Sequence, residues 1–177
     1  WMQDVSQTLE RGFIITIDYG HPAQVLSSKQ RSRGTLRCYY RHTFNSNPFD
    51  HIGDQDITSL VVFTTLINEG DLHGVNTIGL TIQATFLSNL GLGEFQRALT
   101  VRDLPQSIRS ANQMGIRSLV QLEGLGSLRV LIQGKDIVNH HLHGLASENP
   151  LLSQLRASIR TLTPPLLTSD HTPLSAG

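Results

Sequence analysis

The sequence is poor in cysteine, in net charge and in long apolar runs, and each shortage excludes a class of protein. Cys38 is the only cysteine among 177 residues, which excludes an internal disulfide and a cysteine-based zinc site and fits a reducing compartment. Fourteen basic and fourteen acidic residues cancel, so no whole-chain field attracts nucleic acid or an anionic membrane surface. No run approaches the roughly 18 apolar residues of a membrane span. We therefore expect no nucleic-acid and no membrane partner, and specificity must come from a local site.

The residues that are present predict an α/β fold with a sizeable core. The run GFIITIDYGH, residues 12–21, is almost wholly apolar without alternation, which is typical of a central parallel strand covered on both faces. Ligands of such sheets bind beyond the carboxyl ends of the strands, so Asp18 and Tyr19 are candidate site residues. The alternative is that Asp18 and Gly20 only build the exit turn.

The N-terminal segment WMQDVSQTLERG is typical of a helix that ends at Gly12. A central parallel strand needs parallel neighbours, and here only one helix precedes it. We therefore expect the chain to be the carboxyl-terminal part of a larger α/β domain. The apolar residues 13–17 would then lack partners, and a homodimer is one expected consequence.

Further elements are predicted along the chain. Residues 21–34, with Lys29, Arg31 and Arg33, indicate an exposed loop, and the alternation over 34–44 indicates a short strand or extended arm. A helix is expected over 56–70, capped by Asp54 or Asp56 and ended by Gly70. A strand over 74–83, a short helix over 83–91, helices over 95–123 broken by Pro105 and Gly115, and a closing strand over 128–132 complete the expected sheet. Residues 1–136 form the predicted domain, and 137–177 are expected to be a weakly ordered extension.

Two other motifs are interpreted without a ligand. The HHLH run, residues 140–143, offers two imidazoles, which do not close a zinc site without further ligands, so no metal is predicted. The strings GLGEF and GLGSL lack the spacing of phosphate-binding loops and are interpreted as turns.

A mixed cluster follows the first strand. Cations, phenols and an imidazole gather at Arg37, Tyr39, Tyr40, Arg41 and His42. Such a set can hold an acidic or planar group, and it is equally compatible with an ordinary strand edge.

Five ordered motifs carry a family resemblance. They are IDYG, a GTL whose threonine precedes a histidine by seven residues, GDQDIT, TIQATFL and GLGSLRVLIQGK. Together they resemble the MidA family of class I S-adenosylmethionine-dependent methyltransferases, which includes mitochondrial complex I assembly factors that act on a protein arginine. The resemblance covers residues 1–135.

The resemblance implies part of a Rossmann-like class I methyltransferase sheet, with S-adenosyl-L-methionine as cofactor. The family's glycine-rich cofactor loop has no counterpart in this sequence, so the cofactor-binding residues are unknown and the cofactor half of the domain is expected to lie upstream. Where the family usually has His-Val-Asp-Phe, this chain has Leu60, Val61, Val62 and Phe63.

The resemblance also directs the choice of site residues. In methylation of an arginine, a carboxylate would hold the guanidinium through paired hydrogen bonds, and a base would accept a proton. The candidate catalytic residues are Asp18, Asp56, Tyr19 and His42, and the candidate substrate-binding residues are Tyr39, Arg37 and Gln83. For Asp56 the alternative is a pure helix cap.

The predicted function is methylation of a protein side chain by the complete protein. The alternative is a noncatalytic scaffold that keeps the fold. The partner implied by the resemblance is a protein substrate, with a respiratory complex I subunit as one candidate. The implied compartment is the cytoplasm in a bacterium and the mitochondrial matrix in a eukaryote.

Overall fold

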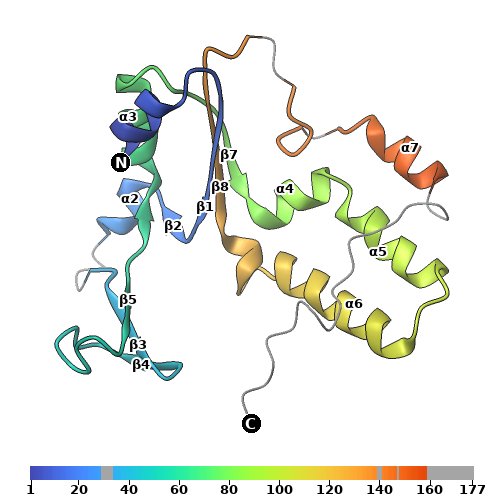
Figure 1. Cartoon of the computed structure of the whole chain (residues 1–177), viewed down its shortest axis with the longest axis horizontal. Helices are drawn as coiled ribbons and strands as arrows, with labels where there is room; N and C mark the ends of the chain where they lie inside the picture. Colours follow the sequence, from blue (N-terminus) through green and yellow to red (C-terminus); the bar gives the residue numbers. More distant parts are fainter. Residues whose placement is uncertain (29–33, 139–140, 147, 159–177) are drawn as a thin grey trace. The chain divides into compact units, whose positions relative to one another are not determined.

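The computed structural model describes the chain except for residues 29–33, 139–140, 147 and 159–177. Two compact units divide it, the first comprising Trp1–Gly79 and Leu131–Val138, and the second comprising the described parts of Leu80–Val130 and Asn139–Gly177. Helices and strands are mixed along the chain, which confirms the predicted α/β class (Figure 1). Along the described residues, no helix combines the length and the apolar character needed to cross a bilayer.

The main sheet has three strands in the order β1 (Gly12–Asp18), β8 (Arg129–Lys135) and β7 (Asn76–Ile82). The predicted strands at these places are confirmed, but their roles are exchanged. The last strand does not close the sheet; it lies between the other two, and all residues from Val130 to Gly134 are buried.

The expectation that residues 12–18 form a strand covered on both faces is wrong for this structure. Strand β1 lies at one side of the sheet, and Phe13, Ile15 and Ile17 are 40%, 56% and 49% exposed. Ile14 and Thr16 point to the other face and are half-buried. An apolar run predicts a strand that needs cover, whereas burial itself depends on which elements pack on each face.

Two helices of the first unit are attached to β8. The amide nitrogen of Gln133 donates to the carbonyl of Leu66 in α3 (Phe63–Leu72), at 3.2 Å. The ammonium of Lys135 donates to the carbonyl of Ser6 in α1 (Met2–Thr8), at 2.6 Å. Gln133 and Lys135 are two residues apart and therefore share one face of the strand, so α1 and α3 lie on that face.

The glycine of the IDYG motif has a packing reason. Gly20 begins β2 (Gly20–His21), which pairs in parallel with β6 (Val61–Val62), and a Cβ on Gly20 would collide with the Val61 carbonyl and the Phe63 ring. Phe63 is fully buried. A residue with a side chain at this position would force β2 and β6 apart. A one-turn helix, α2 (Ala23–Leu26), follows β2 along the chain.

The predicted helix over 56–70 is wrong in its first half. Asp56–Thr58 is strand β5 and Val61–Val62 is β6, because both segments find strand partners, and α3 begins only at Phe63. Gly70 does not end the helix; it lies inside α3, where a Cβ would collide with the side chain of Gln133. The helix ends before Gly74, whose φ of +72° favours glycine.

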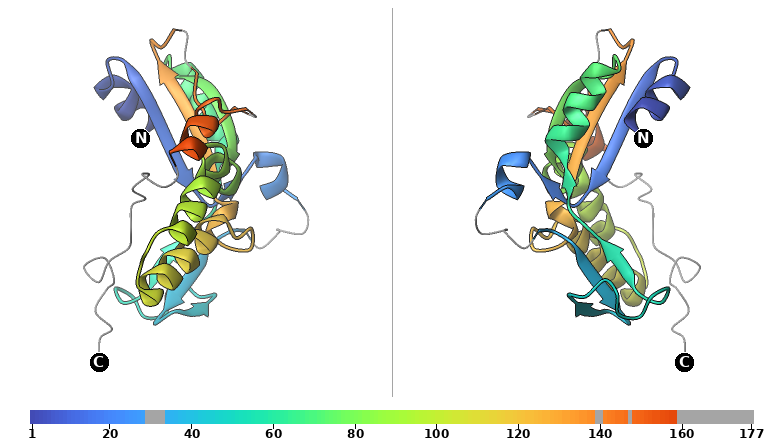
Figure 2. Two further views of the ribbon diagram at one scale, coloured as in Figure 1. Left: turned by 90° about the vertical axis from the view of Figure 1, so that its right-hand side faces the viewer. Right: turned by 90° about the vertical axis from the view of Figure 1, so that its left-hand side faces the viewer.

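A second, antiparallel sheet completes the first unit, in the order β4 (Thr43–Asn45), β3 (Arg37–Tyr40) and β5. Its cyan strands can be followed in Figure 2. Strands β3 and β4 form the predicted extended arm, folded into a hairpin. The basic segment with Lys29, Arg31 and Arg33 lies outside the described residues.

The second unit is mainly helical. Its helices are α4 (Gln83–Asn89), α5 (Leu92–Val101), α6 (Gln106–Val120) and α7 (Leu151–Ala157), with a 3-10 helix over Leu125–Ser127. Pro105 separates α5 from α6 as predicted, whereas Gly115 does not break α6. Helix α7 lies within the range assigned to the C-terminal extension, and residues 159–177 lie outside the described part.

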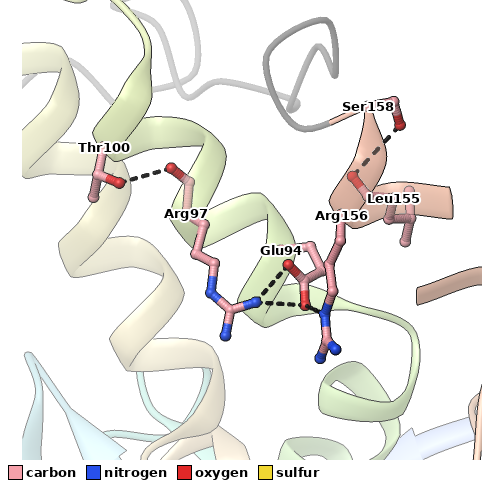
Figure 3. Close-up of polar contacts among 6 residues, drawn as sticks. All are labelled: Glu94, Arg97, Thr100, Leu155, Arg156 and Ser158. Atoms are coloured by element: carbon pink, nitrogen blue, oxygen red, sulfur yellow. Dashed lines mark hydrogen bonds and ion pairs between the residues drawn. The ribbon is translucent and has the colours of Figure 1, made fainter. Parts of the chain in front are cut away.

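A buried carboxylate attaches α7 to α5. Glu94 is 4% exposed; Arg97 donates to both of its oxygens at 2.8 and 2.7 Å, and Arg156 of α7 donates to Oε1 at 2.8 Å (Figure 3). The hydrogen bond from Arg156, with that from Arg97, lowers the pKa of Glu94 below its ordinary 4.5, although burial acts in the opposite direction. Asn149 adds a bond to the carbonyl of Asn89, at 2.8 Å.

Candidate functional site

The first unit contains a pocket of about 530 Å³ beside the small antiparallel sheet. Its lining residues are Tyr39, Arg41, His42, Asp54 and Asp56. The volume lies within the range of ordinary small-ligand pockets, and every lining residue has a polar group. Three of the five, Tyr39, His42 and Asp56, are residues that the sequence predicts for the site.

The strand register explains why these residues meet. Tyr39 of β3 lies opposite Asp56 of β5 on one side and opposite Phe44 of β4 on the other. Directly opposed residues of antiparallel strands share a face, so the phenol, the carboxylate and the Phe44 ring lie on the same side of the sheet. The Tyr39 and Phe44 rings meet edge to face with centroids 6.1 Å apart. Sixteen residues of sequence lie between Tyr39 and Asp56, and only the strand pairing brings the two together.

The hairpin turn supplies the next part of the pocket wall. Arg41 and His42 join β3 to β4, and both have positive φ, of 48° and 63°. Two-residue hairpins with a type I′ turn require positive φ at both central positions and usually place Asn and Gly there. Side chains in this region cost about 1–2 kcal/mol per residue. The turn therefore holds a cation and an imidazole where the backbone favours small residues, a kind of strain that clusters at functional sites.

The cation of this turn is directed to a neighbouring ring. The Arg41 guanidinium carbon lies 5.3 Å from the centre of the Tyr40 ring, within the range of a cation–π contact. The other partner of that ring is His51, stacked at 3.9 Å with an interplanar angle of 8°. The Tyr40 ring therefore contacts both Arg41 of the turn and His51 of the following loop.

The pocket's two carboxylates have free capacity. Asp54 and Asp56 are exposed, and no ion pair joins either of them to a cation within the part of the chain that the structure describes. Each carboxylate can accept several hydrogen bonds, and a planar guanidinium offers five donors. The arrangement can therefore hold a cationic group beside an imidazole able to accept a proton.

Asp56 is not a helix cap. It is the first residue of β5, paired with Tyr39, so the alternative interpretation of this residue is wrong. Asp54 was expected only as a helix cap, and Arg41 only as a member of the mixed cluster; neither was predicted for the site. Asp54 and Asp56 are two residues apart near the start of β5, and this spacing is the sequence signal that could have added Asp54 to the predicted site.

The other predicted site residues do not line the pocket. Arg37 shares the sheet face of Tyr39 but lies opposite Thr58, at the far end of the pairing. Asp18 ends β1 and accepts a hydrogen bond from the backbone nitrogen of Tyr19, at 2.7 Å. The carbonyl of Tyr19 accepts from the nitrogen of Val61, at 2.8 Å. Their roles stay predictions, and the visible contact of Asp18 is that of a turn residue.

Gln83 is placed in the second unit. It is buried at the start of α4, where its amide donates to the carbonyl of Leu119 at 2.9 Å and its backbone nitrogen donates to Leu128 at 2.8 Å. These bonds join α4 to the segments before and after the 3-10 helix. The contacts of Gln83 are therefore structural in this unit.

The second unit has a pocket of its own, of about 300 Å³, mostly apolar. It is lined by Leu90, His143, Asn149, Leu151, Gln154, Leu155 and Ser158. His143 of the HHLH run contacts the ring of His141, with centroids 4.9 Å apart, and His140 lies outside the described residues. Where the chain is described, no group of three or more potential metal-ligating residues comes together.

One glycine of each glycine string is covered by another segment. At Gly91, a Cβ would lie 2.9 Å from Leu155 and 3.0 Å from Leu152, so side chains of α7 already cover this glycine. At Gly126, the backbone of Val120 fills the space. A phosphate or adenosyl group needs open backbone at such a turn, so neither Gly91 nor Gly126 offers it.

Comparison with known proteins finds a family and two solved structures that this chain is similar to. Residues 1–81 match the model of a family described as "Putative S-adenosyl-L-methionine-dependent methyltransferase". The chain is similar to S-adenosyl-L-methionine-dependent methyltransferases. The cofactor of that family is S-adenosyl-L-methionine, and no curated protein matches the chain.

Two solved structures from Burkholderia thailandensis share the fold. One is an uncharacterized protein, with 30% identity and a TM-score of 0.73, covering 82% of this chain and 38% of that one. The other belongs to the same superfamily and is bound to S-adenosyl-homocysteine, with 31% identity, a TM-score of 0.71, and coverage of 82% and 37%. This chain therefore spans less than two fifths of either structure, and its α/β arrangement is methyltransferase-like.

Proposed function

We propose that this chain is part of an S-adenosyl-L-methionine-dependent methyltransferase of MidA type. Its pocket, lined by Tyr39, Arg41, His42, Asp54 and Asp56, receives the side chain of the substrate that is methylated. The observation that carries the proposal is the pair of pocket carboxylates, neither of which forms an ion pair with a cation of the described chain, Arg41 of the same pocket included. The relative bound to S-adenosyl-homocysteine, the product left by the cofactor after methyl transfer, supports the reaction class. The acceptor that fits a carboxylate pair is a protein arginine.

The residues divide the work on the acceptor side. Asp56 and Asp54 accept hydrogen bonds from the guanidinium and orient one nitrogen, since positioning supplies most of the rate in an in-line displacement. His42 accepts the proton that this nitrogen loses. The Tyr39 ring forms a wall against the planar group. S-adenosyl-L-methionine would supply an electrophilic methyl group when bound. The residues that hold this cofactor are not assigned.

The wider setting of the protein is also a proposal. Its partner would be a protein substrate, with a respiratory complex I subunit as one candidate, and a homodimer would cover the exposed residues of β1. The compartment would be the cytoplasm in a bacterium or the mitochondrial matrix in a eukaryote.

A noncatalytic scaffold is the second candidate, and it has one observation in its favour. Leu60 and Val62 replace polar residues expected from the resemblance, and Val62 is half-buried in β6, paired with His21. These apolar side chains serve packing. The same assay separates the two candidates.

The test is methyl transfer from radiolabelled S-adenosyl-L-methionine to arginine-containing peptides by the full-length protein. We expect Asp56→Asn to lower the rate about a hundredfold, because a misplaced acceptor nitrogen costs a reaction that depends on positioning about that much. Asp71→Asn, which removes an exposed carboxylate of α3, is the matched control and should keep the rate.

Thermal melts decide whether the loss is chemical. An active parent protein whose Asp56→Asn variant keeps both its rate and its melting temperature would remove the pocket from the reaction. A parent without transfer to any arginine peptide would favour the scaffold.

A further inference from the structure

The loop Asn45–Gln55 exposes more apolar surface than its surroundings. Phe49 and Ile52 are each 79% exposed, the highest values among the large apolar side chains of the described chain. Phe44 of β4, directly before this loop, is 58% exposed. Scattered single apolar residues are ordinary at a surface, but these three come from one hairpin and its loop, and we refer to them as the apolar patch.

The loop holds these side chains outward by its own hydrogen bonds. The Asn47 side chain accepts from the nitrogen of Phe49 at 3.1 Å and donates to Asp50 at 2.7 Å. The amide of Gln55 donates to the carbonyls of Asn47 and Pro48, at 3.2 and 3.0 Å. Because these hydrogen bonds fix the backbone of the loop, the exposure of Phe49 and Ile52 is a property of the loop's conformation.

The loop is also joined to the pocket. His51 stacks on Tyr40, and the nitrogen of Asp54 donates to the carbonyl of His51 at 2.8 Å, which closes a turn over residues 51–54. Ile52 is at the tip of that turn and Asp54 at its end, in the pocket wall. A bound chain that contacts Ile52 would therefore lie next to the pocket, because Asp54 of the pocket wall is only two residues further along the loop.

The charge of the loop selects among possible occupants. Residues 45–55 contain Asp50 and Asp54 and no lysine or arginine, and Asp56 follows directly. An acidic surface repels the anionic face of a membrane, where inserted loops carry basic residues. It attracts a basic segment, and the exposed Phe49 and Ile52 require apolar partners.

We infer that the loop Asn45–Gln55 is the docking surface for the acceptor protein, and that it binds a basic segment with apolar residues on both sides of the arginine that enters the pocket. The inference rests on the proposed function. Phe49 and Ile52 would be the apolar anchors, which carry most of the binding energy in such contacts. Phe44, on the Tyr39 face of the sheet, would connect the anchors to the pocket.

The experiment measures peptide binding by fluorescence anisotropy with the full-length protein. One synthetic probe has a single arginine flanked by leucines in a lysine-containing 15-residue peptide, and the other has serines in place of the leucines. We expect the parent protein to bind the leucine probe about tenfold more tightly. The double variant Phe49→Ser/Ile52→Ser should lose this preference and keep its affinity for the serine probe. Leu72→Ser, which removes a 75% exposed leucine of α3, is the control and should keep the preference.

Each other outcome overturns the inference. Equal binding of both probes by the parent, or an unchanged preference in the double variant, removes the loop from docking. Binding of the parent to phosphatidylserine vesicles without peptide preference assigns the patch to a membrane. A melting temperature lowered by the double substitution means that another part of the protein covers the patch.

Binding does not require turnover, so the two proposals fail separately. If Asp56→Asn loses methyl transfer while the double variant keeps the leucine preference, the docking surface is wrong and the proposed function stands. If the double variant loses the preference while Asp56→Asn keeps full turnover, the pocket assignment is wrong.

Discussion

Carboxylates have opposite surroundings in the two units of this protein. In the second unit, Glu94 is buried and receives three hydrogen bonds from Arg97 and Arg156. In the first unit, Asp54 and Asp56 are exposed in a pocket, and no ion pair reaches them within the described chain. A carboxylate satisfied by its own chain is structural, whereas one left with free acceptors is available to a ligand.

The largest effect on stability is expected from the buried carboxylate. Glu94→Gln removes the charge that both arginines face, and hydrogen bonds to charged groups contribute about 1.5–3 kcal/mol. We expect a loss of that size in urea unfolding, with faster hydrogen exchange in α7. Glu123→Gln, at an exposed glutamate of the same unit, is the matched control. Equal stability of the two variants would contradict the structural role of Glu94.

Acid sharpens the same comparison. Because the pKa of Glu94 is lowered in the folded protein, its contribution is fully present above about pH 4.5 and is lost as the pH falls through the folded value. The difference in melting temperature between the parent and Glu94→Gln should therefore shrink below pH 4.5. A constant difference down to pH 3 would show that the charge of Glu94 is not its source.

A smaller effect is expected at the glycine under α7. Gly91 has φ +98°, and a Cβ there would press on Leu152 and Leu155, so Gly91→Ala should cost about 1–2 kcal/mol. Gly93→Ala is the matched control, because no atom lies within 4 Å of its Cβ position and it sits inside α5. Alanine favours helices, so the control should be neutral or stabilising. Equal melting temperatures for both variants would show that α7 does not require Gly91.

The smallest effect is expected at Asp18. Asn keeps the oxygen that accepts from the nitrogen of Tyr19, so Asp18→Asn should change stability by less than about 0.5 kcal/mol. We also expect its methyl-transfer rate to fall much less than that of Asp56→Asn. Single-turnover assays beside a thermal melt measure both. A hundredfold loss of rate in a stable Asp18→Asn protein would return Asp18 to the catalytic residues.

The sequence was enough to predict most helices and strands, but the predicted positions of two strands within the sheet were wrong. The apolar run of residues 13–17 and the run of residues 128–132 both predict strands, and both are strands. Which of them is buried depends on the strand order, and the sheet places β8 between β1 and β7. Gly20 and Gly70 show the same limit of local prediction. From the sequence, each glycine predicts a turn or the end of a helix, whereas in the structure each lies where another segment leaves no room for a side chain.

The site divides in the same way. Residue type and the family resemblance were enough to choose Tyr39, His42 and Asp56 as candidates, and these three line one pocket. Strand pairing decided that these three meet with Asp54 and Arg41, and that Asp18, Arg37 and Gln83 do not line the same pocket. The sequence by itself determined the chemical groups of this protein, since these are properties of single residues. The tertiary structure alone decided which groups share a pocket and which neutralise each other, since hydrogen bonds and ion pairs depend on distances of a few ångströms between segments far apart in the chain.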